Sequence, residues 1–285
     1  MHCPAQTAES REFVFTSADF ERIRKLIRDN AGIALSATKH EMVYSRLARR
    51  LRARGLARFS EYVTLLDGRD PAEWQAFVNA LTTNLTSFFR EGHHFATLAA
   101  HAERGRRAGN GHLNVWCSAA STGEEAYSIA MTLVDAFRTY TPPVSIIATD
   151  LDTGVLAKAE AGIYPEERVA KLQPDQVRRF FLRGSSNAPG TIRVRPELRR
   201  LVTFRPLNLL EASWSVRGPF DAIFCRNVMI YFDKPTQRAI LGRFAPLLRS
   251  DGLLFAGHSE SFHHCADLFR LRGNTVYELA RQGGC

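Results

Sequence analysis

The spacing of apolar residues divides the chain into two parts. From Phe15 to about residue 83, apolar residues such as Phe20, Ile23 and Ile27 recur at intervals of three and four, the period of an amphipathic helix. This part is therefore predicted to be a small all-helical domain. Its helices are expected at residues 15–30, from about 36 or 38 to 54, 60–66 and 71–81.

Residues that begin and end helices support these boundaries. Thr16 or Ser17 can cap the first helix, and Ser60 is placed to cap the third. The fourth begins with Asp70-Pro71-Ala72-Glu73, which has the form of a capping box with proline at the first helical position. A glycine follows each of the first two helices, as is typical of helix ends.

Beyond residue 112 the pattern changes to short apolar runs separated by helical stretches. Before the change, a helix containing Phe95 and Leu98 is predicted to be followed by a loop, Arg104–Gly111. Alternating strands and helices predict a parallel, doubly wound α/β sheet. The strands are expected at Val115–Cys117, Val144–Ala148, Val202–Phe204, Asp221–Cys225 and Leu253–Ala256, the helices at 125–138, 153–161 and 235–249, and a closing antiparallel strand at Thr275–Leu279.

Residues 163–201 interrupt this alternation. They contain a short helical pattern, Gln173–Phe181, then the polar loop Gly184–Gly190, then the β-branched run Thr191–Arg195. Glycines that bracket a polar loop before such a run indicate a hairpin. The segment is predicted to be a small antiparallel β subdomain inserted into the α/β domain.

The stretch Leu113–Tyr127 has the form of a strand, a tight loop of small residues and the start of a helix. A dinucleotide fold would carry several glycines here and direct the helix N-terminus at a pyrophosphate. This loop has one glycine, Gly123, followed by Glu124 and Glu125, whose carboxylates would repel a phosphate. We therefore expect a nucleoside site without phosphates, with Gly123 providing clearance for the ligand at the backbone.

Polar residues at the ends of the other strands are candidates for the same site, because ligands of open α/β sheets bind beyond the carboxyl ends of the strands. Asp150 ends the second strand and suits a ribose diol, or it caps the next helix, a role that Asp152 or Thr153 could also fill. Asn208 follows another strand. Arg226-Asn227, with Tyr231 after it, is equally consistent with a site and with capping and core packing.

The charge balance points to an acidic partner. The net charge is +9 and the pI is near 9.7, which suits nucleic acid, a membrane surface or an acidic protein. The second predicted helix carries a run of arginines with no acid among them, which favours a docking surface for something acidic over an ordinary solvated face. These arginines are Arg46, Arg49, Arg50 and Arg54.

The remaining composition excludes several classes of protein. The five cysteines are odd in number and form no C-x-x-C, so free thiols and a reducing compartment are expected. No signal peptide and no apolar run of ~18 residues is present, so we expect a soluble cytoplasmic protein without membrane insertion. No metal-binding spacing of His and Cys occurs, and no G-x-S-x-G, so neither a metal site nor a hydrolase is expected.

Five segments together closely resemble the CheR family of chemotaxis receptor methyltransferases, and the resemblance extends from about residue 15 to 280. It implies an all-helical N-terminal domain, 1–83, and a Rossmann-like methyltransferase domain, 84–285, with the β insertion at 163–201. The matching segments are Thr83–Glu91, Ala119–Glu125, Ala148–Asp150, Phe220–Lys234 and Gly252–Glu260.

The resemblance also implies the reaction. The methyl donor would be S-adenosyl-L-methionine, with S-adenosyl-L-homocysteine as product, and the acceptors would be glutamate side chains of methyl-accepting chemotaxis receptors. Arg90 and Tyr231 match the positions discussed as catalytic in the family. The positions that match the donor pocket are Asn84, Thr86, Arg90, Glu125, Asp150, Asn208, Leu209, Asn227 and Val228.

The physical chemistry agrees with this implication. The donor has a sulfonium, a ribose and an amino-acid tail but no phosphate, which explains an acidic loop where a dinucleotide fold has glycines. A glutamate acceptor is already ionised at neutral pH, because its reference pKa is ~4.3, so no general base is needed. Catalysis would come mainly from positioning in a dry site, with Arg90 orienting the carboxylate and Tyr231 the sulfonium end.

Partners follow from the same resemblance. An acidic receptor helix could lie along Arg46, Arg49, Arg50 and Arg54, and no obligate oligomer is expected. In some family members the β subdomain adds a receptor C-terminal peptide as a strand, and the Gly184–Gly190 loop leaves this open. The alternatives are a nucleic-acid methyltransferase, for which base-flipping and stacking motifs are missing, and a donor-binding module without catalysis.

Overall fold

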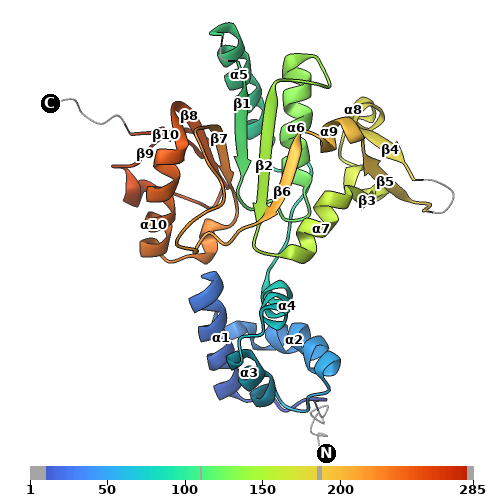
Figure 1. Ribbon diagram of the computed structural model, residues 1–285, viewed down its shortest axis with the longest axis vertical. Helices are drawn as coiled ribbons and strands as arrows, with labels where there is room; N and C mark the ends of the chain where they lie inside the picture. Colours follow the sequence, from blue (N-terminus) through green and yellow to red (C-terminus); the bar gives the residue numbers. More distant parts are fainter. Residues whose placement is uncertain (1–10, 110, 185–187, 281–285) are drawn as a thin grey trace, which may run out of the picture. The chain divides into compact units, whose positions relative to one another are not determined.

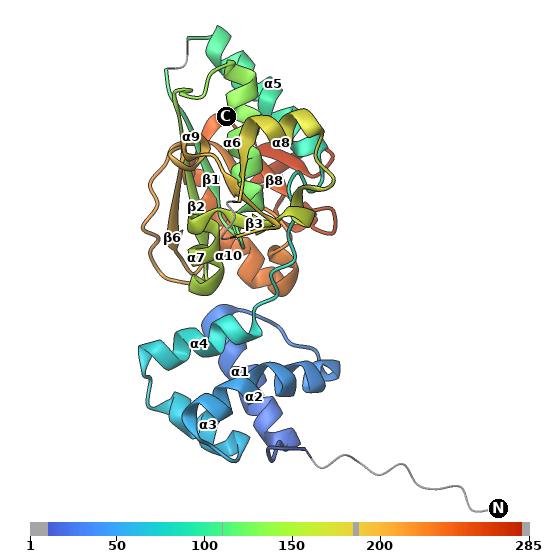
Figure 2. The ribbon, with the colours of Figure 1, turned by 90° about the vertical axis from the view of Figure 1, so that its right-hand side faces the viewer.

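The computed structural model describes residues 11–109, 111–184 and 188–280, and the chain divides into two compact units (Figures 1 and 2). Unit 1 is Met1–Thr82 and unit 2 is Thr83–Cys285. No helix within the described ranges is long and apolar enough to cross a membrane. Cys117, Cys225 and Cys265 are buried free thiols, as predicted, whereas Cys3 and Cys285 lie outside the described residues.

Unit 1 is all-helical, as predicted. Its helices are α1 (Ser17–Ala31), α2 (His40–Arg54), α3 (Phe59–Asp67) and α4 (Pro71–Leu81), with a 3-10 turn at Ala37–Lys39. Thr16 caps α1, because its hydroxyl accepts a hydrogen bond from the amide of Asp19. The predicted cap of α3 is wrong: Ser60 lies in the first turn, and the Glu61 carboxylate binds the amide of Arg58 instead.

A buried carboxylate ties α2 to α4. Asp70 caps α4 as predicted, but Glu73 does not close the capping box; its side chain is fully buried. It accepts hydrogen bonds from Arg50 (2.6 and 2.9 Å), from Nε of Arg54 (2.5 Å) and from the Tyr62 hydroxyl (2.8 Å). Three side chains from two other helices therefore converge on one carboxylate, which could not be buried without them.

The central sheet of unit 2 is mostly parallel, as predicted. Its strand order is β6-β2-β1-β7-β8-β10-β9, in which only β10 runs antiparallel to its neighbours, β8 and β9. The strands are β1 (Leu113–Cys117), β2 (Val144–Asp150), β6 (Val202–Pro206), β7 (Phe220–Cys225), β8 (Leu248–Ala256), β9 (Phe269–Gly273) and β10 (Val276–Leu279). The chain adds β2 and β6 on one side of β1 and then returns to place β7 on the other, so the winding reverses between β1 and β7.

Helices cover both faces of this sheet (Figure 1). They are α5 (His93–Arg107), α6 (Glu124–Phe137), α7 (Thr153–Ala161) and α10 (Lys234–Phe244). Val115 and Cys117 of β1 pack in the core that contains α5 and α6, and Trp116 between them packs in the core that contains α10. This alternation is what a strand buried on both faces requires.

The predicted boundaries of unit 2 fail at three places. α5 continues to Arg107, so no loop begins at Arg104, because arginine is a good helix former. α10 ends at Phe244 and β8 begins at Leu248, inside the stretch predicted as helix. β9 was not predicted; the strand is short, and Phe269 is its only buried residue.

The predicted β subdomain is confirmed as a separate antiparallel sheet to the side of the central one (Figure 1). Its strand order is β3-β5-β4, with β3 (Ile163–Pro165), β4 (Phe181–Arg183) and β5 (Thr191–Val194). β4 and β5 form the predicted hairpin. The short helices α8 (Pro174–Phe180) and α9 (Pro196–Arg199) flank it, and residues 185–187 of the predicted loop lie outside the described residues.

The buried Glu73 predicts an acid-sensitive unit 1. Burial raises the pKa of the Glu73 carboxyl, but hydrogen bonds from Arg50, Tyr62 and Arg54 outweigh it and lower the pKa to about 2. A pKa below the unfolded value means that the ionised carboxylate stabilises the fold above about pH 4.3, and that this contribution is lost as the pH falls towards 2. Glu73→Gln should lower the free energy of unfolding at pH 7 by about 2–3 kcal/mol and flatten its dependence below pH 4.5.

Urea unfolding between pH 7 and pH 2.5 measures both effects. Glu12→Gln is the matched control, because Glu12 also pairs with an arginine of α2, Arg52, but on the exposed surface. The control should change stability little. A loss in Glu73→Gln no larger than in Glu12→Gln would contradict this assignment of Glu73.

Candidate functional site

Three segments distant in sequence meet where the winding reverses, at the carboxyl ends of β1 and β7. The loop after β1 leads into α6, the loop after β7 begins with Arg226, and the segment 84–91 precedes α5. Pairing continues past the strand ends, since the amide of Ser118 donates to the carbonyl of Phe224 (2.8 Å). In sheets of this type, ligands bind beyond the carboxyl ends of the strands at this reversal.

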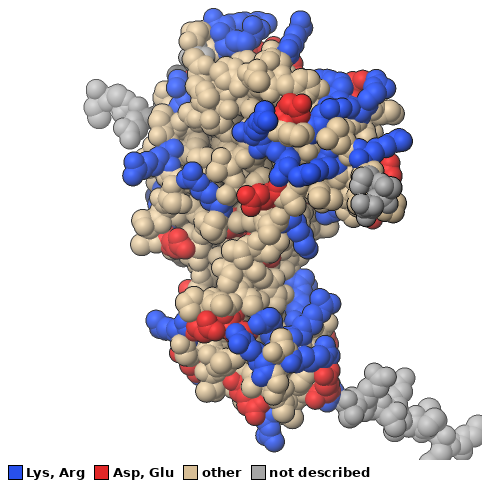
Figure 3. Space-filling view, turned by 45° about the vertical axis from the view of Figure 1, so that its right-hand side comes forward, with Lys and Arg blue, Asp and Glu red and all other residues tan. Residues whose placement is uncertain are grey.

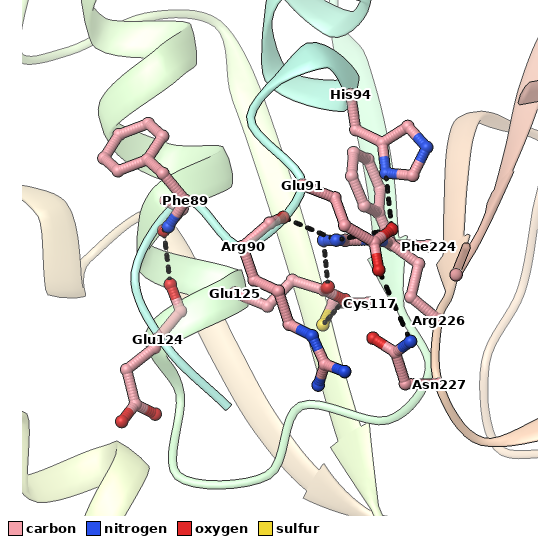
Figure 4. Close-up of polar contacts among 12 residues, drawn as sticks. Phe89, Arg90, Glu91, His94, Cys117, Glu124, Glu125, Phe224, Arg226 and Asn227 are labelled. Atoms are coloured by element: carbon pink, nitrogen blue, oxygen red, sulfur yellow. Dashed lines mark hydrogen bonds and ion pairs between the residues drawn. The ribbon is translucent and has the colours of Figure 1, made fainter. Parts of the chain in front are cut away.

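Arg226 joins the three segments (Figure 4). Its side chain is fully buried. Nη1 donates to Oε2 of Glu125 at 2.6 Å, and Nη2 lies 3.1 Å from Oε2 of Glu91 and donates to the carbonyl of Arg90. The Arg226 guanidinium lies over the ring of Phe95, with Cζ 5.8 Å from the ring centre. We call Glu91, Arg226 and Glu125 the buried triad.

The buried triad is acidic. Two carboxylates share one guanidinium, so with both ionised the three groups carry one net negative charge. Burial raises the pKa of Glu125, and Arg226 offsets only part of that effect, whereas at Glu91 the opposing effect of Arg226 prevails and the pKa is lowered. His94, packed beside Glu91, stays neutral at pH 7, because burial and Arg226 lower its pKa to about 4. Such a site suits a cationic ligand better than a phosphate.

The backbone around this cluster is strained. Phe89, Glu91, Ser121 and Asn227 all have positive φ, between 49° and 59°, a region that side chains other than glycine rarely adopt. Hydrogen bonds hold these conformations: the amide of Phe89 donates to Oγ of Ser128, and that of Ser121 to Asp150. Strain of this kind is concentrated at functional sites in proteins.

Glu260 anchors the loop after β7. Its carboxylate is buried and accepts hydrogen bonds from four backbone amides at 2.5–3.0 Å. These amides belong to Asn227, Val228, Met229 and Gly257. The loop that carries Asn227 and Val228, two predicted donor-pocket residues, therefore takes its shape from one side chain that the residue pattern did not single out.

Asp150 lies at the end of β2, next to the loop after β1. Oδ2 accepts from the amide of Ser121 (2.8 Å), Oδ1 accepts from the amide of Asp152 (2.9 Å), and burial raises the pKa of the carboxyl to about 6. The cap of α7 is Asp152, which accepts from the amides of Gly154 and Val155, so Asp150 does not have that role. The amide of Leu151 also bonds to this carboxylate, so the carboxylate keeps at least one lone pair for a ligand hydroxyl.

Gly123 does not provide clearance for a ligand, contrary to the sequence-based expectation. It has φ of +96°, and a Cβ there would lie 2.8 Å from Cβ of Ala159 and 2.9 Å from the hydroxyl of Tyr164. Ala159 is in α7 and Tyr164 in β3. Glycine is required here because the start of α6 packs closely against these elements.

The other predicted site residues are in the loops of the same unit. Nδ2 of Asn84 donates to Asp152 (2.9 Å), the carbonyl of Thr86 accepts from Arg168, and Oδ1 of Asn208 accepts from the amide of Leu210. Leu209 is buried in the core that contains α10.

Arg90 and Tyr231 both have polar groups available. Nη1 of Arg90 donates to the carbonyl of Leu85 (2.8 Å), and the guanidinium points away from the buried triad (Figure 4). Tyr231 is half-buried at the end of the 3-10 turn Met229–Tyr231. Within the described part of the chain, no hydrogen bond or ion pair links the Tyr231 hydroxyl to the buried triad.

The sequence analysis included Arg226 and Glu91 but did not predict that they contact each other and Glu125. Arg226 was noted only as a polar residue after a strand, and Glu91 only within a matching segment. An arginine directly after a strand that is apolar except for Asp221 is itself a signal, because a guanidinium buried at such a place needs carboxylates nearby. Among the described residues, no group of three or more His, Cys, Asp or Glu side chains is arranged to hold a metal ion.

Comparisons with known proteins match most of the chain. The family model "CheR methyltransferase, all-alpha domain" matches residues 18–82, and "CheR methyltransferase, SAM binding domain" matches residues 84–278. The chemotaxis protein methyltransferase of Klebsiella aerogenes is 58% identical over 94% of this chain and 91% of its own. That of Escherichia coli is 54% identical over 95% and 94%, and chemotaxis protein methyltransferase 2 of Pseudomonas aeruginosa is 54% identical over 97% and 98%.

The role of Glu260 can be tested by substitution. Glu260→Gln replaces one acceptor oxygen with a donor amide and removes the charge, so at least one backbone amide loses its partner. We expect a loss of about 2–4 kcal/mol in the free energy of unfolding and much faster hydrogen exchange at the amides of residues 227–229. Glu211→Gln, at an exposed acid of the same unit, is the control. Exchange at 227–229 as slow as in the control would contradict the anchoring role.

Proposed function

The chain belongs to the CheR methyltransferase family, and from this premise we propose that it methylates glutamate side chains of chemotaxis receptors, forming γ-glutamyl methyl esters. It is an S-adenosyl-L-methionine-dependent methyltransferase of chemotaxis, as its relatives and the two matching family models establish. The choice of glutamate and the roles of single residues belong to the proposal. One feature carries it: an acidic, buried site at the winding reversal, where a nucleotide-binding fold would accept phosphates.

The residues present fit the donor. Asp150 has spare acceptor capacity for ribose hydroxyls, and Glu125 with the surplus negative charge of the buried triad suits a cationic amino-acid tail and sulfonium. When bound, the donor supplies a methyl group activated by its sulfonium. We propose that the residues that hold it are Asn84, Thr86, Arg90, Glu125, Asp150, Asn208, Leu209, Asn227 and Val228.

The reaction needs no general base from the protein. A glutamate acceptor with a reference pKa of ~4.3 is ionised at neutral pH and can attack the methyl carbon directly. Arg90 suits the task of orienting that carboxylate: Nη1 is anchored on the Leu85 carbonyl, and in the described chain its other nitrogens have no partner. Tyr231, whose hydroxyl has no hydrogen-bond partner among the residues that the structure describes, would fix the donor end. Positioning then supplies most of the rate enhancement.

Methyl transfer to receptor-containing membranes tests this function. With radiolabelled donor, we expect label in receptors that is released by base, as an ester requires. Arg90→Ala and Tyr231→Phe should lower turnover at saturating donor by about 100-fold, because the reacting groups lose their alignment. Arg106→Ala, at an exposed arginine of α5, should leave turnover unchanged.

Other outcomes would favour the alternatives. Label in nucleic acid and not in receptors would identify a nucleic-acid methyltransferase. Donor binding with no transfer to any acceptor would identify a binding module. Full turnover in Arg90→Ala or Tyr231→Phe, with normal donor affinity, would remove these residues from the mechanism.

The arginines of α2 are proposed to receive an acidic receptor helix, and their environments differ. Arg50 and Arg54 bind Glu73, and Arg46 donates to the carbonyls of Leu81 (3.1 Å) and Thr82 (2.6 Å). Arg49 is exposed and pairs with no other residue in the described ranges. Acidic side chains also lie among the basic ones on the visible face of unit 1 (Figure 3). Three of the four therefore also serve the fold, and Arg49 is the one whose charge is fully available.

Further partners and the location are proposals of the same kind. A receptor C-terminal peptide could add as a strand to β3 or β4, the outer strands of the small sheet, and calorimetric titration with such peptides would measure it. The protein is proposed to act as a monomer in the cytoplasm, without nucleic acid as a partner.

Charge reversal separates docking from folding. Arg49→Glu should weaken receptor methylation about fivefold through a higher KM for receptor, because it replaces attraction by repulsion at the edge of an interface. Stability and donor affinity should stay unchanged. Lys25→Glu, at an exposed lysine of α1, is the control. Unchanged KM in Arg49→Glu, or a loss of donor binding, would contradict docking at this helix.

A further inference from the structure

Arg226 bridges the two halves of the proposed site. One nitrogen binds Glu125, in the first turn of α6, at 2.6 Å. The other donates to the carbonyl of Arg90 and lies 3.1 Å from Glu91, both in the segment before α5. These partners lie 101 to 136 residues from Arg226 in sequence. No other described side chain bonds both to Glu125 and to the segment 84–91.

Arginine alone has the geometry for this arrangement. Its planar guanidinium directs donors along fixed, diverging directions, so it can hold a carboxylate on one side and a carbonyl with a second carboxylate on the other. A lysine ammonium is a single point charge and cannot reach both sides at once. The Phe95 ring lies beneath the guanidinium, and Glu260 holds the amide of the following residue, Asn227. The Phe95 ring therefore supports the guanidinium, and Glu260 fixes the backbone next to Arg226.

The strain of the segment 84–91 makes this bond consequential. Phe89 and Glu91 both have positive φ, so Arg90 lies between two residues in unfavourable conformations. The Arg226 bonds to Glu91 and to the Arg90 carbonyl are among the contacts that keep this short turn in place. Without these bonds, the strained backbone around Arg90 would move towards more favourable φ values, and Arg90 would move with it.

We infer that Arg226 is a positioning residue that sets the place of Arg90 relative to the donor pocket. It acts through the carbonyl of Arg90 and the carboxylate of Glu125, while its own guanidinium stays buried and apart from the acceptor. The inference rests on the proposed function, because it assigns Arg90 to the acceptor side and Glu125 to the donor side. The inference predicts that donor affinity depends mainly on the positive charge at position 226. Turnover should depend on the two-sided hydrogen bonding of the guanidinium as well.

Two substitutions separate these contributions. Arg226→Met removes both charge and geometry, and leaves Glu91 and Glu125 as buried carboxylates without a cation. We expect donor affinity to fall at least tenfold and turnover at saturating donor about 100-fold. Arg226→Lys restores a cation beside Glu125 but cannot bridge to Arg90. Donor affinity should return to within about threefold of the wild type, while turnover stays at least tenfold low.

Arg249→Met is the matched control. Arg249 pairs with Asp221 (3.3 Å) of β7, at the opposite end of the strand that Arg226 follows. Its loss should lower thermal stability while leaving donor affinity and turnover unchanged. The measurements are thermal unfolding, calorimetric binding of S-adenosyl-L-methionine and of S-adenosyl-L-homocysteine, and steady-state receptor methylation with each variant.

The outcomes decide between positioning and plain stabilisation. Arg226 variants that lose thermal stability as Arg249→Met does, yet keep wild-type donor affinity and turnover, overturn the inference. Equal recovery of affinity and turnover in Arg226→Lys also overturns it, because charge alone would then suffice. If Arg226→Met does not fold, Arg226→Lys decides by the same comparison. Wild-type protein that binds donor but does not label receptors refutes the proposed function instead, while the affinities still test the link from Arg226 to Glu125.

Discussion

A guanidinium buried at the carboxyl edge of an apolar sheet is the constraint on which the site depends. Burying such a charge without partners costs far more than the fold could supply, so Arg226 must be met by acceptors that are themselves buried. The chain meets this need with Glu125 from one side and with Glu91 and the Arg90 carbonyl from the other. The position of three segments is thus determined by the hydrogen-bonding needs of one side chain.

The same logic applies to the backbone. Loops that close a ligand site cannot use regular secondary structure, so their amides need other acceptors. Glu260 supplies one carboxylate for four amides, and Asp150 receives those of Ser121 and Asp152. These hydrogen bonds also stabilise residues with positive φ, such as Asn227, in conformations that are otherwise unfavourable. Preorganised, strained loops agree with a reaction whose rate depends on positioning.

Unit 1 has a similar buried cluster with the charges reversed. One buried carboxylate, Glu73, accepts hydrogen bonds from two arginines and a tyrosine. The arginine run of α2 was predicted to be a docking surface, yet Arg50 and Arg54 are needed inside the unit and Arg46 binds carbonyls at the end of α4. A row of like charges on a helix therefore does not reveal which members are free. That distinction requires knowing where an acid from another helix lies.

The sequence by itself determined the class of fold, the helical unit and the β insertion, because these follow from local periodicity. It also predicted the edge of the sheet at which the candidate site lies, from the rule that ligands bind beyond strand ends. It also indicated an acidic pocket, since Glu124 and Glu125 stand where phosphate-binding glycines would be. Only the tertiary structure decided that Glu73 is buried, that Gly123 serves packing against Ala159, and that Arg226 joins Glu91 to Glu125. These are long-range contacts, and local patterns cannot specify which distant residue compensates a buried charge.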